Sequence, residues 1–379
     1  MPYIVRRQTP YQRTVTEKTI SDDSESQEET ISYGDQTGTI TRIRVPTRFE
    51  IKQTNIPHLI EILETYCNQY QRLFEKPRQD LYQTFYIPKQ TGGLRRIDAP
   101  REELMDALRE LKGIFERHFN ALYHTSAFAY VSGRSTIDAV KKHQYNESKW
   151  FLKTDFSDFF GSTSKEFIEK SLSVIFPFSE VVQSDVGKQA LSKAVDLCML
   201  NGGLPQGTPI SPMLTNLIMI PIDYALFNTL AKEHFVYTRY ADDILISNKR
   251  SFDPDDIQNW IARVLKEHHA PYVIKKEKTR YASSSGSNWN LGVMLNKDNE
   301  ITVGYQKKKQ FKAMVNSFIL DHLNQKPWPL DDVNYLAGLL SYYTMVERDY
   351  FNHMIDAYNT KYHVDFRTML KNAQKGSFS

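Results

Sequence analysis

The stretch that decides the fold is residues 234–247, which read HFVYTRYADDILIS. Two runs rich in aromatic and β-branched residues flank Ala241-Asp242-Asp243, and this pattern is typical of a tight β-hairpin. A carboxylate flanked by apolar strand residues is costly to desolvate unless it is paired or binds a cation. We therefore predict an antiparallel hairpin that presents Asp242 and Asp243 at its turn.

A second carboxylate ends another apolar strand. Residues 150–156 read WFLKTDF and contain Asp155. Carboxylates from two separate strands can converge to hold two Mg²⁺ ions, which stabilise the attacking and leaving oxygens of a phosphoryl transfer. Because Asp-Asp pairs occur four times in this chain, the dipeptide at 242–243 has little weight alone, and a surface turn is the alternative.

The composition is that of an ordinary globular chain and limits the candidate functions. Two cysteines, Cys67 and Cys198, cannot form a disulfide framework or a zinc site by themselves. The apolar stretch 217–227 is shorter than the roughly 20 residues of a membrane helix and contains Pro221 and Asp223. The basic N-terminal residues precede no apolar core, so we expect no signal peptide and a cytoplasmic protein without a membrane partner.

Charge is unevenly distributed, although the net charge is only +3. Residues 21–36 hold six acidic residues and no basic one, whereas residues 275–280 (KKEKTR) and 305–312 (YQKKKQFK) are strongly basic. Basic patches of this kind suit a phosphate-bearing ligand, and a merely solvated face is the alternative.

The predicted order of elements is mixed α/β followed by a helical tail. The first 45 or so residues are polar and lack periodicity, which predicts a flexible or irregular extension. Apolar spacing and turn signals predict helices over residues 58–74, 101–122 and 186–200, strands over 81–89, 94–100 and 150–156, a hairpin over 291–305, and helices from there to about residue 375.

Several stretches resemble the motifs of reverse transcriptases and follow that family's order. RYADDILIS resembles the Tyr-x-Asp-Asp signature, and KTDFSDFF, which contains Asp155, resembles the first aspartate motif. The other matching stretches are LRRIDAP (94–100), LPQGTPISPMLTNL (204–217), VIKKEKTRY (273–281), NLGVML (290–295) and LAGLLSYY (336–343), so the resemblance spans about residues 85–350.

This resemblance implies an α+β right-hand polymerase fold. Fingers and palm, built from an antiparallel sheet plus helices, are expected over residues 51–305, and a helical thumb over 306–379, after a partly irregular N-terminal extension over 1–50. The implied activity is that of an RNA-directed DNA polymerase, a nucleotidyltransferase that extends a primer with dNTPs by two-metal phosphoryl transfer. Two Mg²⁺ ions are the expected cofactors, and Mn²⁺ is expected to substitute.

The implied metal ligands are Asp155 and Asp242, with Phe156 and Asp243 beside them in the same motifs. Adjacent strand residues point to opposite faces, so Asp243 is expected to matter less for direct ligation. Lys278 is expected to donate a proton to the leaving pyrophosphate or to neutralise its charge. The alternative is one more solvated lysine in a basic run.

Substrate contacts are implied for the arginine and glycine motifs. Arg95 is in the position of the arginine that holds the triphosphate, and the alternative is that Arg96 does so while Arg95 faces solvent. Gln206 and Gly207 form a loop whose small size permits close backbone approach to a base pair, and turn structure alone is the alternative.

Three aromatic residues complete the expected site. Phe160 lies where the family places its sugar-selecting residue, and a bulky ring under the sugar would clash with a ribose 2′-OH, which implies dNTPs. The alternative is that Phe160 belongs to the core next to Phe156 and Phe159. Phe156 and Tyr240, in the two aspartate motifs, are also expected to contact substrate.

Two departures separate the chain from a standard retron enzyme. Retrons usually carry Asn-Ala-x-x-His where this chain runs from Asp138 to His143 with one extra residue, and SSSGSNWNLG (283–292) replaces a Val-Thr-Gly motif. We expect a compact bacterial reverse transcriptase of the retron-like, group II intron-like or phage-defence-associated kind. Its expected partners are a specific non-coding RNA template, the DNA product and dNTPs, with a protein partner or oligomer left open.

Three other functions stay open at this point. Untemplated or protein-primed DNA synthesis would use the same palm. An RNA-dependent RNA polymerase would share the two metal ions, but Phe160 and the Tyr-Ala-Asp-Asp frame argue against it. A non-catalytic nucleic-acid-binding scaffold is disfavoured because all three acidic residues are present.

Overall fold

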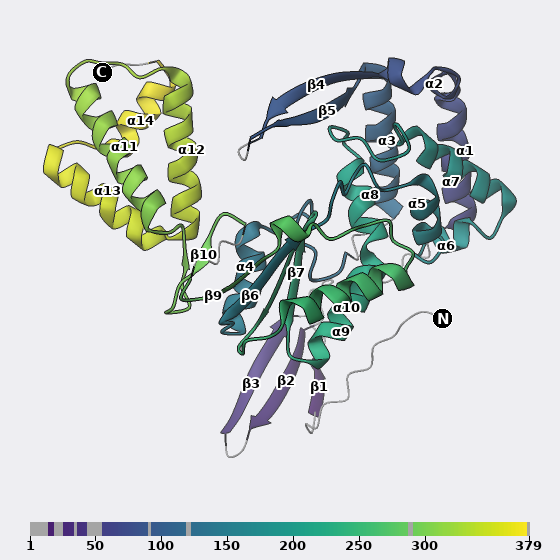
Figure 1. The fold of residues 1–379 in the computed structure, drawn as a ribbon, viewed down its shortest axis with the longest axis horizontal. Helices are drawn as coiled ribbons and strands as arrows, with labels where there is room; N and C mark the ends of the chain where they lie inside the picture. The colour runs from purple at the N-terminus through teal and green to yellow at the C-terminus, as the bar shows by residue number, and fades with distance from the viewer. Residues whose placement is uncertain are drawn as a thin grey trace. The chain divides into compact units, whose positions relative to one another are not determined.

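A computed structural model describes residues 14–18, 26–33, 36–43, 55–89, 92–118, 123–286 and 291–376. The chain divides into two compact units, Met1–Leu59 and Ile60–Ser379. The second unit holds every motif identified in the sequence (Figure 1).

The N-terminal unit contains a three-stranded antiparallel sheet in the order β1-β2-β3. Its strands are β1 (Thr14–Lys18), β2 (Ser26–Tyr33) and β3 (Gln36–Ile43). The prediction of an irregular chain is therefore wrong for these segments. Their signal lay in alternating Thr and Ile residues such as TGTITRI, which favour a pleated strand even without a large apolar content. The rest of the predicted extension lies outside the described residues.

A helical and hairpin region follows, as the sequence predicts. The helix predicted over 58–74 is two helices, α1 (Ile56–Gln69) and α2 (Gln71–Glu75), which Tyr70 separates. The short 3₁₀ helix η1 (Arg78–Leu81) leads into the hairpin of β4 (Tyr82–Pro88) and β5 (Leu94–Pro100). Helix α3 (Glu102–His118) then packs on β5.

The central sheet has the order β7-β8-β6-β9 and is antiparallel throughout. Its strands are β6 (Trp150–Asp155), β7 (Val236–Tyr240), β8 (Asp243–Asn248) and β9 (Arg280–Ser283). The predicted hairpin is confirmed, because Tyr240 pairs with Asp243 across a two-residue turn. The register also places Asp155 opposite Asp243.

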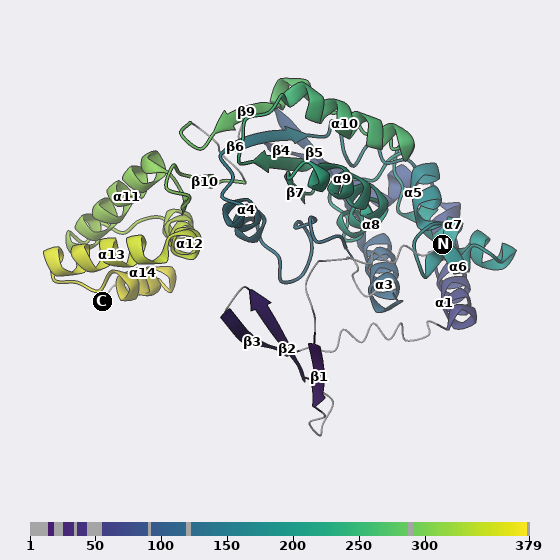
Figure 2. The same ribbon diagram turned by 90° about the horizontal axis from the view of Figure 1, so that it is seen from below.

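Helices cover this sheet and connect its strands. Helices α4 (Thr136–Tyr145) and α9 (Ile220–Lys232) both pack on β7, and α10 (Pro254–Glu267) packs on α9 (Figures 1 and 2). The remaining connecting elements are α5 (Lys165–Leu172), α6 (Phe178–Val181), α7 (Asp185–Leu197), α8 (Ser211–Ile218) and the 3₁₀ helix η2 (Lys276–Lys278).

The fully buried His143 joins α4 to the sheet. Its Nδ1 lies 2.6 Å from the Ser247 hydroxyl on β8, and its Nε2 lies 2.8 Å from the Thr238 hydroxyl on β7. Burial lowers the pKa of His143 to about 3, so the ring is neutral at physiological pH. His143, in the segment that differs from the usual retron motif, therefore has a structural role and joins α4 to β7 and β8.

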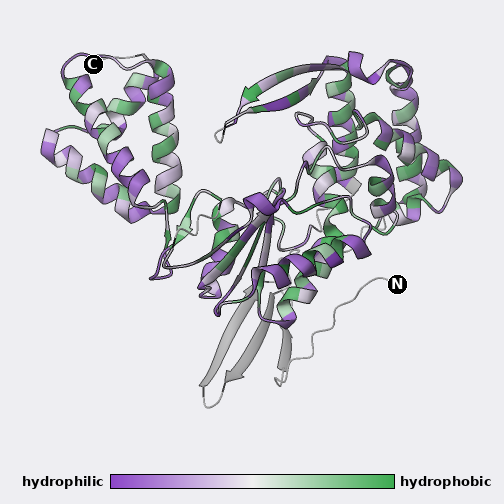
Figure 3. Ribbon diagram, viewed as in Figure 1, coloured by the Kyte–Doolittle hydropathy of each residue, from purple (hydrophilic) through white to green (hydrophobic). Residues whose placement is uncertain are grey.

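The C-terminal part is a helical bundle, as predicted. After the two-stranded β10 (Met294–Leu295) and β11 (Ile301–Thr302), it consists of α11 (Tyr305–Leu323), α12 (Leu330–Val346), α13 (Arg348–Tyr362) and α14 (Phe366–Gln374). Each helix carries both hydrophobic and hydrophilic residues (Figure 3), as expected when one face packs in a bundle. Its core includes Phe311, Leu336, Phe351 and Phe366.

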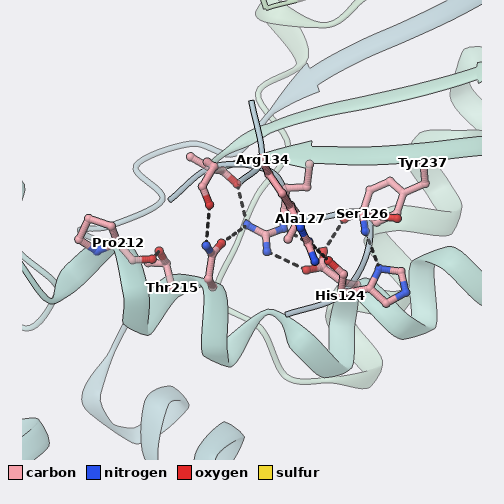
Figure 4. A network of polar contacts seen from close by, with 12 residues as sticks. His124, Ser126, Ala127, Arg134, Pro212, Thr215 and Tyr237 are labelled. Atoms are coloured by element: carbon pink, nitrogen blue, oxygen red, sulfur yellow. Dashed lines mark hydrogen bonds and ion pairs between the residues drawn. The ribbon is translucent and has the colours of Figure 1, made fainter. Parts of the chain in front are cut away.

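A buried polar network lies beneath the β7–β8 turn (Figure 4). The Arg239 guanidinium, fully buried, donates two hydrogen bonds to the Asp223 carboxylate, from Nε at 2.9 Å and Nη2 at 2.7 Å. Its Nη1 donates to the Asn216 side chain at 3.2 Å and to the Ala241 carbonyl at 3.1 Å. The Tyr237 hydroxyl donates to the same Asp223 carboxylate at 2.7 Å. Arg239 therefore links the β7–β8 turn to Asn216 on α8 and Asp223 on α9.

Among the described residues, no single helix is long and apolar enough to cross a membrane. Helices α8 and α9 meet that criterion only as a pair, and they are bent by 46° at their junction.

Breaking the buried ion pair is expected to destabilise the fold strongly. Arg239→Met leaves the Asp223 charge buried without compensation, which costs about 3–5 kcal/mol of unfolding free energy. Arg239→Met combined with Asp223→Leu removes both charges and is expected to lose much less. Urea unfolding measures both, with exposed Arg250→Met as the control. A single variant as stable as the control would contradict this assignment.

Acidification is expected to weaken the fold through His143. The pKa of His143 is about 3 in the folded protein and about 6.5 in an unfolded chain. Between these two values, the unfolded state binds a proton at His143 and the folded state does not. The free energy of unfolding should therefore fall as pH drops below about 6.5, by up to about 1.4 kcal/mol per unit. Urea unfolding between pH 7.5 and 5 should show a shallower decline for His143→Gln. Equal slopes in the two proteins would refute this role.

Candidate active site

Asp155 is the best-buried acid of the predicted site and ends β6 with only 6% of its surface exposed. Its Oδ2 accepts a hydrogen bond from Lys278 Nζ. Its Oδ1 is buried and has no hydrogen-bond partner among the described residues. Burying a carboxylate oxygen without a hydrogen-bond donor costs free energy. Asp155 Oδ1 is therefore suited to bind a cation or to accept a hydrogen bond from a ligand.

Asp242 lies beside Asp155 at the β7–β8 turn. The Phe156 backbone N–H donates to the Asp242 carbonyl at 3.2 Å, which joins the two aspartate motifs directly. Burial raises the pKa of Asp242, and the negative charges of Asp243 and Asp155 raise it further. This clustered negative charge favours a bound cation.

Lys278 pairs with Asp155 and lies within electrostatic reach of Asp242 and Asp243. Its hydrogen bond with Asp155 raises the pKa of Lys278, and the charges of Asp155, Asp242 and Asp243 add to that effect. The Lys275 backbone N–H also donates to the Asp155 carbonyl at 2.9 Å, which holds the lysine-bearing segment against β6. The structure therefore brings Asp155, Asp242 and Lys278 together from three separate motifs.

Asp243 has a separate partner. Its carboxylate lies 3.2 Å from Lys153 Nζ on β6. Lys153 and Asp155 are two residues apart on one strand, so they share a face. Sequence reasoning missed Lys153, although strand alternation from Asp155 could have identified it.

The carboxylates fit a divalent cation chemically, although they form no preformed cage. Among the described residues, no group of three or more His, Cys, Asp or Glu side chains could hold a metal ion. However, Asp155 Oδ1 lacks a partner and the pKa of Asp242 is raised by its acidic neighbours. Oxygen ligands suit Mg²⁺, which usually binds one or two carboxylates and keeps water and substrate phosphates as its other ligands.

The two arginines of β5 differ in their partners. Arg96 donates to the Asp98 carboxylate from Nε at 2.9 Å, and Thr84 also donates to that carboxylate at 2.6 Å. The Arg95 side chain is exposed, and it forms no hydrogen bond or ion pair with a described residue, although its backbone pairs with Ile87 of β4. Since Arg96 is already engaged, Arg95 is the one available for a phosphate.

Gly207 closes the contact between β5 and the loop before α8. The Asp98 backbone N–H donates to the Gln206 carbonyl at 2.8 Å. Gly207 has a φ of +120°, and a Cβ there would come within 2.9 Å of the Ile97 side chain. Only glycine combines that backbone conformation with so close an approach.

The predicted aromatic contacts have different environments. Phe156 is buried and stacks on Phe159 and Tyr272, so only its main chain is available to the site. Phe160 is half-buried and meets Phe159 edge to face, which leaves part of its ring accessible. Tyr240 is also half-buried, at the end of β7 beside the turn.

The basic run at the start of α11 is partly engaged within the protein. Lys307 Nζ donates to the Gly292 carbonyl at 2.8 Å, and Lys308 pairs with Glu347 at 2.5 Å. Lys309 and Lys312 are exposed and form no ion pair with a described acid, although Lys312 lies over the Tyr350 ring. Lys309 and Lys312 are therefore the two lysines of this run that form no ion pair within the described residues.

Arg239, missed by sequence reasoning, supports the whole site. The signal was a cation inside an apolar strand, because a buried guanidinium requires a buried acid nearby. An acid that is itself inside an apolar run was the matching candidate, and Asp223 in residues 217–227 is such an acid.

Telomerase from Candida albicans in complex with a TWJ fragment of telomeric RNA aligns at 13% identity with a TM-score of 0.42. The alignment covers 78% of this chain and only 60% of that one. A likeness of this size carries no conclusion about activity or partners.

The sequence comparisons place the chain in a family. The profile described as "Reverse transcriptase (RNA-dependent DNA polymerase)" matches residues 87–314. Retron Ec83 reverse transcriptase from Escherichia coli is 27% identical over 275 residues, covering 70% of this chain and 83% of that protein. Retron Ec73 reverse transcriptase from Escherichia coli is 26% identical over 279 residues, covering 70% and 85%. The chain belongs to the reverse transcriptase family, is of the prokaryotic retron type and is an RNA-directed DNA polymerase.

Proposed function

We propose that this polymerase works by two-metal phosphoryl transfer centred on Asp155 and Asp242. The observation that carries this proposal is the partnerless buried Asp155 Oδ1 beside the acidic turn. The main chain of Phe156 and the carboxylate of Asp243 would complete the ligand set. When bound, Mg²⁺ ions, or Mn²⁺ in their place, would stabilise the attacking and leaving oxygens of the transfer.

The protein's own side chains would hold and discriminate the nucleotide. Arg95, free of internal partners, would make charge-assisted hydrogen bonds to the triphosphate. Lys278, whose raised pKa keeps it protonated at neutral pH, would neutralise the leaving pyrophosphate or donate a proton to it. The accessible part of the Phe160 ring would exclude a ribose 2′-OH.

We propose further that the template is a dedicated non-coding RNA, copied in the cytoplasm as part of an anti-phage defence system. The support is the resemblance to retron reverse transcriptases. Residues 51–305 would act as fingers and palm and 306–379 as thumb, with Lys309 and Lys312 contacting duplex phosphates. Phosphate contacts of that kind are independent of sequence and sensitive to salt.

Removing either carboxylate is expected to abolish synthesis. Asp155→Asn and Asp242→Asn should each lower dNTP incorporation on an RNA template with a DNA primer by at least about a thousandfold. Asp331→Asn, in the exposed Asp-Asp pair of α12, is the matched control and should remain active. Mg²⁺ titration of the wild type should restore activity after chelation. Activity in Asp155→Asn comparable to the control would refute the metal assignment.

The natural template can be tested with the same variants. Sequencing nucleic acids that co-purify with the wild type should give one defined RNA and complementary DNA that is absent from Asp242→Asn. DNA without a complementary RNA would indicate untemplated or protein-primed synthesis instead. Identical nucleic acid from both proteins would favour a binding scaffold.

Shortening Phe160 is expected to relax sugar selection. Phe160→Ala should incorporate rNTPs at a rate detectable against its dNTP rate, because space opens for the 2′-OH. Primer extension with each nucleotide set measures the ratio, and continued dNTP synthesis shows that the variant folds. Undetectable rNTP incorporation with intact dNTP synthesis would mean that Phe160 is only a core residue.

A further inference from the structure

Tyr130 is an exposed aromatic residue in a backbone conformation that bulky side chains rarely adopt. Its φ is +59° and 55% of its surface is exposed. Left-handed backbone at a non-glycine residue is strained, and it persists only where the surroundings over-determine it. Neither the sequence motifs nor the proposed chemistry accounts for this residue.

The loop that carries Tyr130 is held at its base by Arg134. The Arg134 guanidinium Nη1 donates to the His124 carbonyl at 2.7 Å and to the Ala127 carbonyl at 2.6 Å. A single arginine thus ties both sides of the loop together (Figure 4). These two hydrogen bonds fix the conformation of the loop that carries the Tyr130 side chain.

The same loop is joined to the strand that leads into the catalytic turn. The Arg239 backbone N–H donates to the Ser126 carbonyl at 2.7 Å, and the Phe128 N–H donates to the Arg239 carbonyl at 2.9 Å. The Asn216 side chain donates to the Ala129 carbonyl at 2.7 Å and accepts from the Arg239 guanidinium. That guanidinium also holds the turn through the Ala241 carbonyl. Tyr130 and the turn are therefore positioned by one network.

Tyr130 also lies within the electrostatic reach of the proposed site. Burial raises the pKa of the Tyr130 hydroxyl, Asp242 and Tyr240 raise it further, and Arg95 lowers it. The loop pairs with β7 at Ala127 and Arg239, one residue before Tyr240, so the turn that carries Asp242 lies near the Tyr130 loop. Phe160 and Arg95 already account for the sugar and phosphates of the incoming nucleotide.

We propose that Tyr130, together with Tyr240, forms an aromatic platform beside Asp242 that supports the terminal base pair of the primer–template duplex. This inference rests on the proposed catalytic role of Asp242. The flat amphipathic ring of Tyr130 packs against the sugar edge of that base pair and keeps the primer 3′ end at the carboxylates. A misplacement of about 1 Å at such a position costs about a hundredfold in rate. A rigid backbone at Tyr130 therefore favours catalysis, although its left-handed conformation is strained.

Primer extension with separate kinetic constants tests this placement. Tyr130→Ala should lower the rate of first-nucleotide addition by about tenfold or more and raise the KM for primer–template, because an aromatic contact with the duplex is lost. The KM for dNTP should change by less than about twofold. Tyr130→Phe keeps the ring and should stay within about threefold of wild type. Tyr145→Ala, at an exposed tyrosine of α4, is the matched control and should match wild type.

A rise confined to the KM for dNTP would overturn the proposal, because the contact would then be with the incoming nucleotide. Wild-type kinetics for Tyr130→Ala would also overturn it. An active Asp242→Asn variant would instead refute the proposed catalytic role of Asp242. The two failures can be distinguished, because Tyr130→Ala is assayed in an enzyme that keeps Asp242.

A stability measurement separates function from folding. Asparagine adopts left-handed backbone more readily than tyrosine, so Tyr130→Asn relieves the local strain. We expect its thermal midpoint to equal or exceed that of the wild type while primer extension falls as in Tyr130→Ala. A lower midpoint with unchanged extension per folded molecule would show that Tyr130 serves the fold alone.

Discussion

One buried guanidinium is the constraint on which the active site depends. Arg239 loses its hydration entirely, and Asp223 on α9 compensates its charge through two hydrogen bonds. Such a pair contributes little net stability compared with apolar residues, but removing one partner is very costly. Here the pair positions two segments. The Arg239 guanidinium donates to the Ala241 carbonyl in the turn, and through Asn216 it is linked to the loop that carries Tyr130.

The carboxylates meet because of strand register. Pairing of β6 with β8 puts Asp155 opposite Asp243, and the two-residue turn then leaves Asp242 beside Phe156. Lys278 holds one oxygen of Asp155 while the other has no partner among the described residues. A protonated lysine in this position compensates part of the acidic charge and leaves Asp155 Oδ1 as the proposed ligand atom for a cation.

Much of this architecture could be predicted from the sequence, and the failures have physical causes. The hairpin at 234–247 and the helical tail were predictable because apolar periodicity is a local signal. The β1–β3 sheet was missed because its segments are polar and only their β-branched residues indicate strands. Arg239 and Lys153 left local signals, a cation inside an apolar strand and strand alternation from Asp155. Their partners, and the proposed role of Tyr130, depend on contacts between distant segments that no local pattern encodes.

The two sides of the proposed nucleotide site are built with different rigidity. The acidic turn and the Tyr130 loop belong to one hydrogen-bonded network, whereas Arg95 lies on a two-stranded ribbon whose β4 residues are mostly exposed. An isolated two-stranded ribbon is marginally stable in water. This ribbon is anchored to the rest of the site at Asp98, through the Gln206 carbonyl and the close approach of Gly207. Arg95 lies three residues before that anchor, in the exposed half of β5, so its side chain is held less firmly than the carboxylates of the β7–β8 turn.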